Sequence, residues 1–338
     1  MRDLLNGHNK TKLIIIIAAA VALLAAIYCV LNYFERYGEV EDVTGDGFAK
    51  TVPDINYEGE TYSYKGRLKN IAILGVDDKD IANEKNGVSY MGGRTDMIFL
   101  VSIDYANRTV TPIQITRDAM VEYAPMDSSG NRLGSDYESI TFAYSYGDGG
   151  RISANNTKEA LSNLLYGTPI TDCFSIQVDG VAPLNDAVGG VTVTVEDDFS
   201  NIDPSLTQGA TVTLTGTQAA EFVRSRTGVG DETNEERMSR HRTYLTSFMD
   251  TLRPKLEEDR TLISTLLDGI SEYSYSSMSA ATIASIINNT ADFEVKDIIT
   301  PTGTTVEDKT GHNWHLVELD DEQLKKIIVN TFYEKVEE

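Results

Sequence analysis

Arginines are concentrated in one short part of an otherwise acidic chain. The cluster comprises Arg224 and Arg226 in EFVRSRTG and Arg237, Arg240 and Arg242 in EERMSRHR. The 338 residues together carry a formal net charge of −23, so these side chains oppose the general trend. A guanidinium is always charged, and its rigid fork of donors matches two phosphate oxygens at once. The cluster therefore indicates a site for a phosphate or a diphosphate.

An ordinary surface helix is the alternative interpretation of the same cluster. Glu232, Glu235 and Glu236 are close enough in sequence to pair with these arginines on a helix surface. The charge pattern alone leaves both interpretations open.

Three further polar groups flank apolar runs that we predict as β-strands, over residues 70–75, 97–104 and 110–116. These groups are Asp77, Arg94-Thr95-Asp96 and Arg117-Asp118. Functional side chains concentrate at strand ends, where a rigid sheet holds them together. If the strands are neighbours, Asp77 and Asp96 can share one divalent cation, since magnesium is usually held by few carboxylates and by substrate phosphate oxygens.

Each of these residues also has a simpler interpretation. An aspartate after a strand is more often a turn former than a metal ligand. Arg94 and Arg117 could equally be ordinary salt-bridge partners. None of the three groups is specific by itself.

The elements around these residues favour a layered fold. We predict helices over residues 217–224 and 235–252, the second from its apolar stripe, and expect that helix to end at Pro254. Strands are also expected over 174–178 and 191–195. The tail is predicted to contain helices over about 258–271, 279–289 and 320–332, and a hairpin near 293–319. Strands alternating with helices favour an α/β (α+β) domain with a central mixed β-sheet flanked by helices.

The N-terminal part predicts a membrane anchor. Residues 13–31 contain no charged side chain, and a helix of that length crosses a hydrocarbon core about 30 Å thick. Lys10 and Lys12 precede the run and acidic residues dominate after it, so the positive-inside rule places the N-terminus in the cytoplasm. The expected organisation is a cytoplasmic tail (1–12), a transmembrane helix (13–34), an extracytoplasmic stalk (35–66) and one large extracytoplasmic domain (67–338).

A cleaved signal peptide is the alternative for this segment. Its apolar region would be shorter and would end in small residues at the cleavage site. Here the run ends in YCVLNYF, which offers no such site. A lipid anchor on Cys29 is disfavoured by the bulky Ile27 and Tyr28 before it. We therefore expect an uncleaved anchor in the cell membrane.

Composition excludes two further classes of protein. The chain has only two cysteines, Cys29 in the predicted anchor and Cys173 outside it, so the external domain cannot rely on an internal disulfide. Nucleic-acid binding normally needs a basic surface. The strongly acidic chain carries no such surface and no recognisable reading motif, so no nucleic-acid partner is expected.

Taken in order, several motifs resemble the LytR–CpsA–Psr family. They are NIAILGVDD, GGRTDMIFLVSID, VTPIQITRDAMV, FAYSYGDGG, DGVAPLNDAVGGVTVTV, LTGTQAAEFVRSR and ERMSRHRTYL, over about residues 68–252. The tail, with ITPTGT and GHNWHLVELDDEQL, is similar to the C-terminal part of the family. Its members are membrane-anchored phosphotransferases that move teichoic acid, capsular or other polymers from a polyprenyl-diphosphate carrier to peptidoglycan.

The resemblance implies roles for individual residues. Asp77 and Asp96 match the metal ligands of the family, which implies Mg²⁺ or Mn²⁺, and together with Arg117 they would carry the catalysis. The residues that match the diphosphate-binding positions are Arg94, Arg117, Arg224, Arg226 and Arg237, with Arg240 and His241 in place of an Arg-Gln pair. The resemblance also implies a mixed sheet between helices and an apolar tunnel for the polyprenyl chain.

The chain departs from the family pattern at three places. His241 replaces the expected Gln, and Ser139-Ile140-Thr141 replaces a Lys-Ile-Asn sequence. The spacing between Asp77 and Asp96 is longer than usual, which implies an expanded loop over 79–92. Arg242 matches nothing in the family and is expected to be a solvated surface charge.

The expected function is the transfer of a secondary cell-wall glycopolymer from a polyprenyl-diphosphate carrier to peptidoglycan at the outer face of the membrane. Two alternatives use the same binding site. In one, water is the acceptor and the protein is a lipid-diphosphate hydrolase. In the other, the protein binds the lipid carrier without turnover and regulates envelope assembly.

Overall fold

The computed structural model describes residues 52–77, 83–85, 88–90, 92–258, 262, 266, 269–290, 293–308 and 314–337. The predicted cytoplasmic tail, transmembrane helix and most of the stalk lie outside the described residues. In the part of the chain that the structure describes, no helix is long and apolar enough to span a membrane. The anchor therefore stays a prediction from the sequence.

The strands predicted over residues 97–104 and 110–116 form a hairpin. β6 (Thr95–Asp104) pairs antiparallel with β7 (Thr109–Ile115), with Asp104 opposite Thr109. The connecting turn is closed by Asp104, whose Oδ1 accepts hydrogen bonds from the backbone amides of Ala106 (3.0 Å) and Asn107 (2.9 Å). Aspartate commonly bonds to amides two or three residues further on in such turns. Both strands confirm the sequence prediction.

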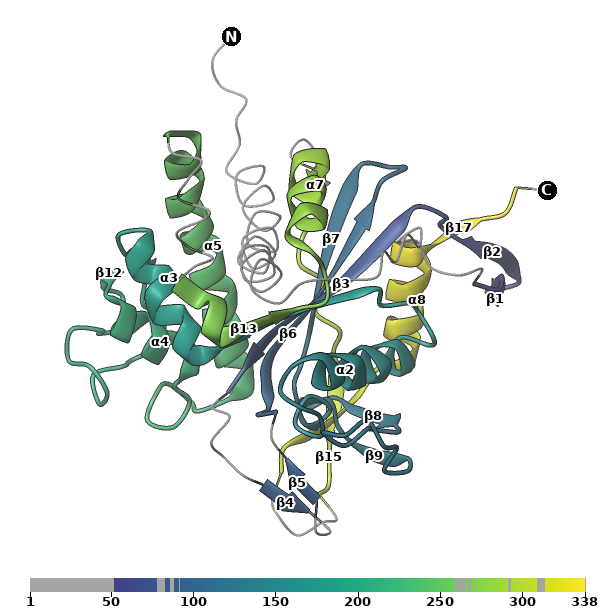
Figure 1. Ribbon diagram of the computed structural model, residues 1–338, viewed down its shortest axis with the longest axis horizontal. Coiled ribbons are helices and arrows are strands. Elements are labelled where there is room, and N and C mark those ends of the chain that lie inside the picture. Colours follow the sequence, from purple (N-terminus) through teal and green to yellow (C-terminus); the bar gives the residue numbers. More distant parts are fainter. Residues whose placement is uncertain are drawn as a thin grey trace. The chain divides into compact units, whose positions relative to one another are not determined.

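These strands belong to a six-stranded sheet with the order β13-β10-β3-β6-β7-β14 (Figure 1). The other four strands are β3 (Leu68–Val76), β10 (Asp172–Gln177), β13 (Ser274–Ser276) and β14 (Glu294–Val295). In β3 every residue except Gly75 is buried, as expected of a strand with neighbours on both sides. β14 runs parallel to β7, whereas β6 runs antiparallel to it. The predicted mixed sheet is thus confirmed.

The folded chain divides into two compact units. The sequence predicts one domain over residues 67–338. In the described part, unit 1 contains Gly75 to Asp77 and Ser175 to Asn289. Unit 2 contains the described residues before Gly75, those between 83 and Phe174, and those from Thr290 onwards. Each unit is discontinuous in sequence, and each is described by itself.

Residues 55–64, which the sequence predicts as part of the stalk, form strands in unit 2. β1 (Ile55–Tyr57) and β2 (Glu60–Tyr64) form a hairpin, and β2 also pairs with β17 (Tyr333–Lys335) near the C-terminus. The rings of Tyr64 and Tyr333 meet edge to face at 5.5 Å. The strands are short and polar, so the sequence resembled a linker although its partner lies at the far end of the chain.

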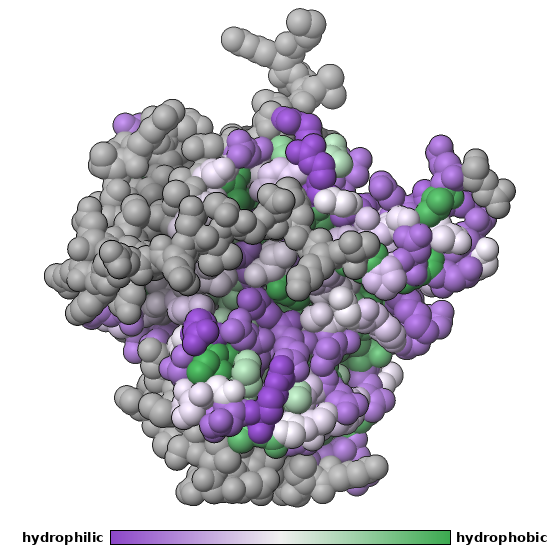
Figure 2. Space-filling model, turned by 45° about the vertical axis from the view of Figure 1, so that its right-hand side comes forward, coloured by the Kyte–Doolittle hydropathy of each residue, from purple (hydrophilic) through white to green (hydrophobic). Residues whose placement is uncertain are grey.

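The rest of unit 2 consists of two helices and short hairpins. They are α2 (Arg151–Leu164), α8 (Asp321–Phe332), β4 (Asn83–Lys85), β5 (Val88–Tyr90), β8 (Met120–Tyr123), β9 (Asp136–Ser139), β15 (Gly303–Val306) and β16 (Leu316–Leu319). α2 packs along β8. In Figure 2 the described residues of the visible face are mostly hydrophilic, with small separate hydrophobic patches. Scattered apolar side chains of this kind are ordinary on a protein surface.

Unit 1 contains the helices on which the arginine cluster lies. α4 (Gly216–Arg224) begins with a capping box between Thr215 and Gln218, which satisfies amides that have no partner inside the helix. The other elements of this unit are α3 (Val181–Ala187), β11 (Val191–Thr194), β12 (Thr211–Leu214), α5 (Asn234–Glu258) and most of α7 (Ala280–Thr290). α5 continues past Pro254, where we expected it to end. A proline inside a helix removes one hydrogen bond and clashes with the preceding turn, which commonly kinks or ends the helix, but α5 runs on to Glu258.

Candidate functional site

Asp96 and Arg117 meet at one end of the β6–β7 hairpin, in unit 2. Ile98 lies opposite Ile115 in the strand register, and continuing that register by two residues sets Asp96 opposite Arg117. The Arg117 guanidinium forms an ion pair with the Asp96 carboxylate. Arg117 is buried and Asp96 is partly exposed. The hairpin thus brings together two residues that the sequence predicted separately.

The backbone at this strand end is held by residues 139–141, where the chain departs from the family pattern. The Ser139 hydroxyl and the Thr141 amide both donate to the carbonyl oxygen of Arg117, each at 3.1 Å. The Thr141 hydroxyl donates to the Thr95 carbonyl at 2.9 Å. Ser139 and Thr141 are buried. Their side chains therefore fix the backbone beside Asp96 and Arg117.

Arg94 lies beside an aromatic residue that the sequence analysis did not assign to the site. Its guanidinium carbon is 6.0 Å from the centroid of the Trp314 ring, within the range of a cation–π contact. The ring of Phe142 meets Trp314 edge to face at 5.4 Å. Trp314 comes from the tail motif GHNWH and remains 39% exposed.

His315, the next residue, contacts the acidic neighbour of Arg117. Its Nδ1 lies 3.3 Å from Asp118 Oδ2, and its Nε2 lies 3.2 Å from the Thr305 hydroxyl. Asp118 Oδ1 is 3.6 Å from Arg117 Nε. Asp96, Arg117, Asp118 and His315 therefore form a continuous chain of contacts. The only sequence signal for this was the tail motif, whose partner Asp118 lies 197 residues earlier.

Asp77 follows β3 directly, is half-buried and belongs to unit 1. A cation shared with Asp96 therefore stays a prediction. Among the described residues, no group of three His, Cys, Asp or Glu side chains could hold a metal ion. Two carboxylates suit a magnesium ion that takes its other ligands from water and phosphate. A carboxylate has about four lone-pair sites, so Asp96 can hold Arg117 and a cation together.

Arg224 and Arg226 are exposed and lie at the C-terminal end of α4 and just beyond it. The last carbonyl groups of a helix have no partner within it. Here two buried residues of α5 supply donors: Arg240 Nε donates to Phe222 O (3.2 Å), and His241 Nε2 lies 2.9 Å from Val223 O. The cluster thus divides into exposed arginines and buried residues that hold their backbone.

Arg240 has its charge balanced inside unit 1. Its Nη1 lies 2.5 Å from Asp197 Oδ2, its Nη2 donates to the Ser225 carbonyl, and its guanidinium carbon lies 5.2 Å from the Phe199 ring centroid. Only 1% of the residue is exposed. A direct contact of Arg240 with a diphosphate would require some of these bonds to break, so its geometry suits a supporting role.

His241 is neutral in the folded protein. Burial, and then the nearby charge of Arg237, lower its pKa to about 3. Its Nε2 therefore carries the proton donated to Val223, and its Nδ1 is buried with no hydrogen-bond partner in the described part of the chain. Replacing the expected Gln with His thus adds no charge at neutral pH.

The remaining two arginines of the cluster are not simple surface charges. Arg237 is 4% exposed, and its Nη2 donates to Asn234 Oδ1 at 2.9 Å. Arg242 is half-buried: burial lowers its pKa, while the nearby carboxylates of Glu196 and Glu235 oppose that shift. Arg242 was expected to be a solvated surface charge, whereas in the structure it is half-buried and lies near the carboxylates of Glu196 and Glu235.

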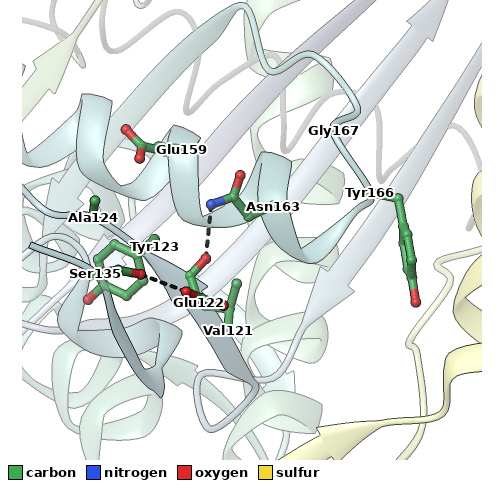
Figure 3. A pocket seen from close by; sticks show the side chains of 9 residues that line it. All are labelled: Val121, Glu122, Tyr123, Ala124, Ser135, Glu159, Asn163, Tyr166 and Gly167. Atoms are coloured by element: carbon green, nitrogen blue, oxygen red, sulfur yellow. Dashed lines mark hydrogen bonds between the residues drawn. The ribbon is translucent and has the colours of Figure 1, made fainter. Parts of the chain in front are cut away.

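A separate pocket in unit 2 includes none of the predicted site residues (Figure 3). It has a volume of about 590 Å³ and lies between β8 and the C-terminal half of α2. The Ser135 hydroxyl donates to Glu122 Oε1 (2.8 Å), and Asn163 Nδ2 donates to the Glu122 carbonyl (2.9 Å). The side chain of Tyr166 extends away from these groups in Figure 3. Glu122, Ser135 and Asn163 are thus paired with one another, whereas Glu159 pairs with Arg132, which does not line the pocket.

Comparison with known proteins decides the family. The model of the LytR_cpsA_psr family matches residues 41–331 of the chain. The chain belongs to the LytR–CpsA–Psr family. The match starts ahead of β1, which agrees with the folded segment before residue 67.

Curated relatives in this family have names that state an activity. Polyisoprenyl-teichoic acid–peptidoglycan teichoic acid transferase TagV of Bacillus subtilis is 28% identical over 177 residues, 51% of this chain and 40% of that protein. TagU of Oceanobacillus iheyensis is also named a polyisoprenyl-teichoic acid–peptidoglycan teichoic acid transferase. It is 30% identical over 199 residues, which are 57% of this chain and 55% of that protein. The chain thus spans about half the length of the curated relatives it matches.

Solved structures share the fold of this LytR–CpsA–Psr protein. The structure of TagT bound to LI-WTA has a TM-score of 0.58 and 16% identity, and the match covers 87% of this chain and 98% of that one. At this level of identity the likeness concerns the fold alone. It agrees with the mixed sheet and helices described above.

Proposed function

We propose that this protein is a membrane-anchored phosphotransferase that moves a secondary cell-wall glycopolymer from a polyprenyl-diphosphate carrier to peptidoglycan. The observation that carries the proposal is the Asp96–Arg117 pair at the end of the β6–β7 hairpin. Membership of a family whose relatives are named teichoic acid transferases supports it. Teichoic acid, capsular polymer or a similar glycopolymer would be the group transferred.

The reaction would exchange one phosphorus–oxygen bond for another. A hydroxyl of the peptidoglycan glycan attacks the phosphorus that carries the polymer. The bond from that phosphorus to the oxygen bridging the two phosphates breaks, and polyprenyl phosphate leaves. The proton of the hydroxyl passes to solvent or to the leaving phosphate. Such reactions need little covalent help from the protein, so positioning and charge stabilisation supply most of the effect.

The residues of this chain suit those two tasks. Arg117 is buried and fixed by Asp96 and by the backbone bonds from residues 139–141, so its charge is preorganised. Arg224 and Arg226 are exposed on a helix end that buried side chains hold. Asp77 and Asp96 would hold Mg²⁺ or Mn²⁺, which, when bound, neutralises charge on the diphosphate. Arg94 and Arg237 complete the proposed set.

The location of the protein is part of the proposal. The apolar run 13–31, with lysines before it and acidic residues after it, supports a single-pass protein of the cell membrane. Its N-terminus would be cytoplasmic and both folded units would lie outside. The carrier lipid and peptidoglycan would then be available on the same side of the membrane.

Replacing Arg117 tests the proposed site. Arg117→Ala should lower the rate of transfer from a lipid-diphosphate donor to peptidoglycan about 10²–10³-fold, the usual cost of removing one preorganised charge contact. Arg132→Ala is the matched control, because Arg132 forms an exposed ion pair with Glu159 in the same unit. Its rate should stay within about twofold of the original. Undiminished transfer by a folded Arg117→Ala protein would rule out the proposed site.

A further inference from the structure

Trp314 is a large aromatic side chain at the surface, next to a proposed diphosphate ligand. Its ring lies 6.0 Å from the Arg94 guanidinium carbon and meets Phe142 edge to face at 5.4 Å. Its backbone amide donates to Asp308 Oδ2 at 2.8 Å. The indole is therefore held in place although 39% of the residue stays exposed. An aromatic ring that is held in place loses little conformational entropy when a ligand stacks on it.

His315 places polar atoms beside this ring. Its imidazole lies between Asp118 Oδ2 (3.3 Å) and the Thr305 hydroxyl (3.2 Å), and 56% of its side chain is exposed. Asp118 is in turn within 3.6 Å of Arg117 Nε. The tail residues thus add an apolar surface and hydrogen-bonding groups next to both Arg94 and Arg117.

A sugar attached to a phosphate has the chemistry that this combination binds. One face of a pyranose ring is lined by C–H groups and packs against an aromatic ring, whereas its edge carries hydroxyls. Binding sites commonly combine an apolar or aromatic surface with a few oriented polar groups. The first sugar of the polymer must also lie directly beside the diphosphate, and therefore beside the arginines that would hold that group.

We propose that Trp314 and His315 form a subsite for the sugar joined to the diphosphate. Trp314 stacks on the apolar face of the sugar, and a sugar hydroxyl replaces the Thr305 hydroxyl as the hydrogen-bond partner of His315 Nε2. The two residues select the substrate and take no part in bond breaking. This inference rests on the proposed function, because it names the part of the substrate that lies next to the diphosphate.

Two ligands that differ only in the sugar test the subsite. The dissociation constants of the full chain in detergent micelles are measured for polyprenyl diphosphate with one N-acetylhexosamine and for polyprenyl diphosphate without a sugar. Trp314→Ala should weaken binding of the sugar-bearing ligand about tenfold and leave binding of the sugar-free ligand unchanged. Trp314→Phe, which keeps a ring, should lose less. Tyr166→Ala removes another exposed aromatic residue of unit 2 and should change neither constant.

Fluorescence gives a second readout, because Trp314 is the only tryptophan of the chain. The sugar-bearing ligand should change its emission more than the sugar-free ligand does. His315→Asn should also weaken binding of the sugar-bearing ligand alone.

Three results would overturn the subsite, and they separate it from the proposed function. An equal loss of affinity for both ligands in Trp314→Ala would mean that Trp314 only supports Arg94. Unchanged affinity for both would mean that no sugar reaches the ring, while transfer that depends on Arg117 would leave the proposed function standing. Failure of the original protein to bind either ligand would contradict the proposed function and the subsite together.

Discussion

At the scale of single residues, His241 shows how burial controls charge. Its imidazole is enclosed in unit 1 with one hydrogen bond to Val223, and its pKa falls to about 3. An imidazole in the unfolded chain has its ordinary pKa of about 6.5. The folded protein therefore keeps His241 neutral at pH values at which the unfolded chain binds a proton there.

Acid should destabilise the protein through His241. Below pH 6.5 the unfolded chain binds a proton at this position, whereas the folded protein binds none until the pH approaches the lowered pKa. The free energy of unfolding should therefore fall as pH falls through this window, by roughly 1.4 kcal/mol per pH unit at most. The stability gained at neutral pH is present above the unfolded pKa and lost below it.

His241→Gln should remove this part of the pH dependence, because glutamine does not titrate. Urea unfolding of the full chain at pH 7 and pH 5 should show the variant losing about 2 kcal/mol less than the original over that interval. Both proteins carry the same carboxylates, so other titrations cancel in the comparison. Equal losses in the two proteins would mean that His241 is protonated in the folded state.

At the scale of elements, the end of α4 depends on side chains from α5. Arg240 and His241 bond to carbonyl groups of Phe222, Val223 and Ser225, and Asp197 balances the charge of Arg240. These contacts fix the backbone that carries Arg224 and Arg226. The apparent cluster of equivalent arginines thus contains exposed residues and residues that support them.

Arg240→Ala should destabilise the folded protein by about 3 kcal/mol or more, because it leaves a partly buried carboxylate and two carbonyl groups without their donor. Arg132→Ala, which breaks an exposed pair, should cost about 1 kcal/mol or less. The midpoints of urea unfolding measure both effects. Similar midpoints for the two variants would show that the contacts of Arg240 contribute little.

Local sequence patterns were sufficient for the strands and helices that carry the site. Apolar runs located β6 and β7, and their antiparallel pairing then placed Asp96 opposite Arg117. The helix stripe located α5 but not its continuation through Pro254. Trp314 and His315 were missed because their partners are distant in sequence, which no local pattern reveals. In the sequence, Ser139 and Thr141 are only departures from the family pattern. The structure shows what they do, because their hydroxyls donate to the backbone carbonyls of Arg117 and Thr95.

At the scale of the whole molecule, the sequence predicts the membrane anchor, whereas the structure shows how the folded part is organised. Two compact units and a three-stranded sheet formed by β1, β2 and β17 are visible only in the structure. The short polar strands of that sheet carry no strong periodicity, so the sequence suggested a stalk. The anchor, in contrast, is a prediction from hydropathy and flanking charge alone.

The anchor prediction has a direct test. Mature protein from cell membranes should have the mass of the complete chain and should resist extraction by salt or alkali. An epitope at the N-terminus should be accessible only after the membrane is permeabilised. A mature protein that begins near residue 35 would instead indicate a cleaved signal peptide.

The central claim is that the protein transfers a phosphate-linked glycopolymer to peptidoglycan, and product analysis of one reaction tests it most directly. The purified full chain, a polymer-bearing polyprenyl diphosphate, magnesium and peptidoglycan oligomers should yield a polymer joined to glycan through one phosphate. One polyprenyl phosphate should be released for each transfer, and Arg117→Ala should lower the rate of formation of both products to the same extent. Polymer phosphate released at the same rate with and without the glycan, or tight binding of the donor with no turnover, would contradict the account.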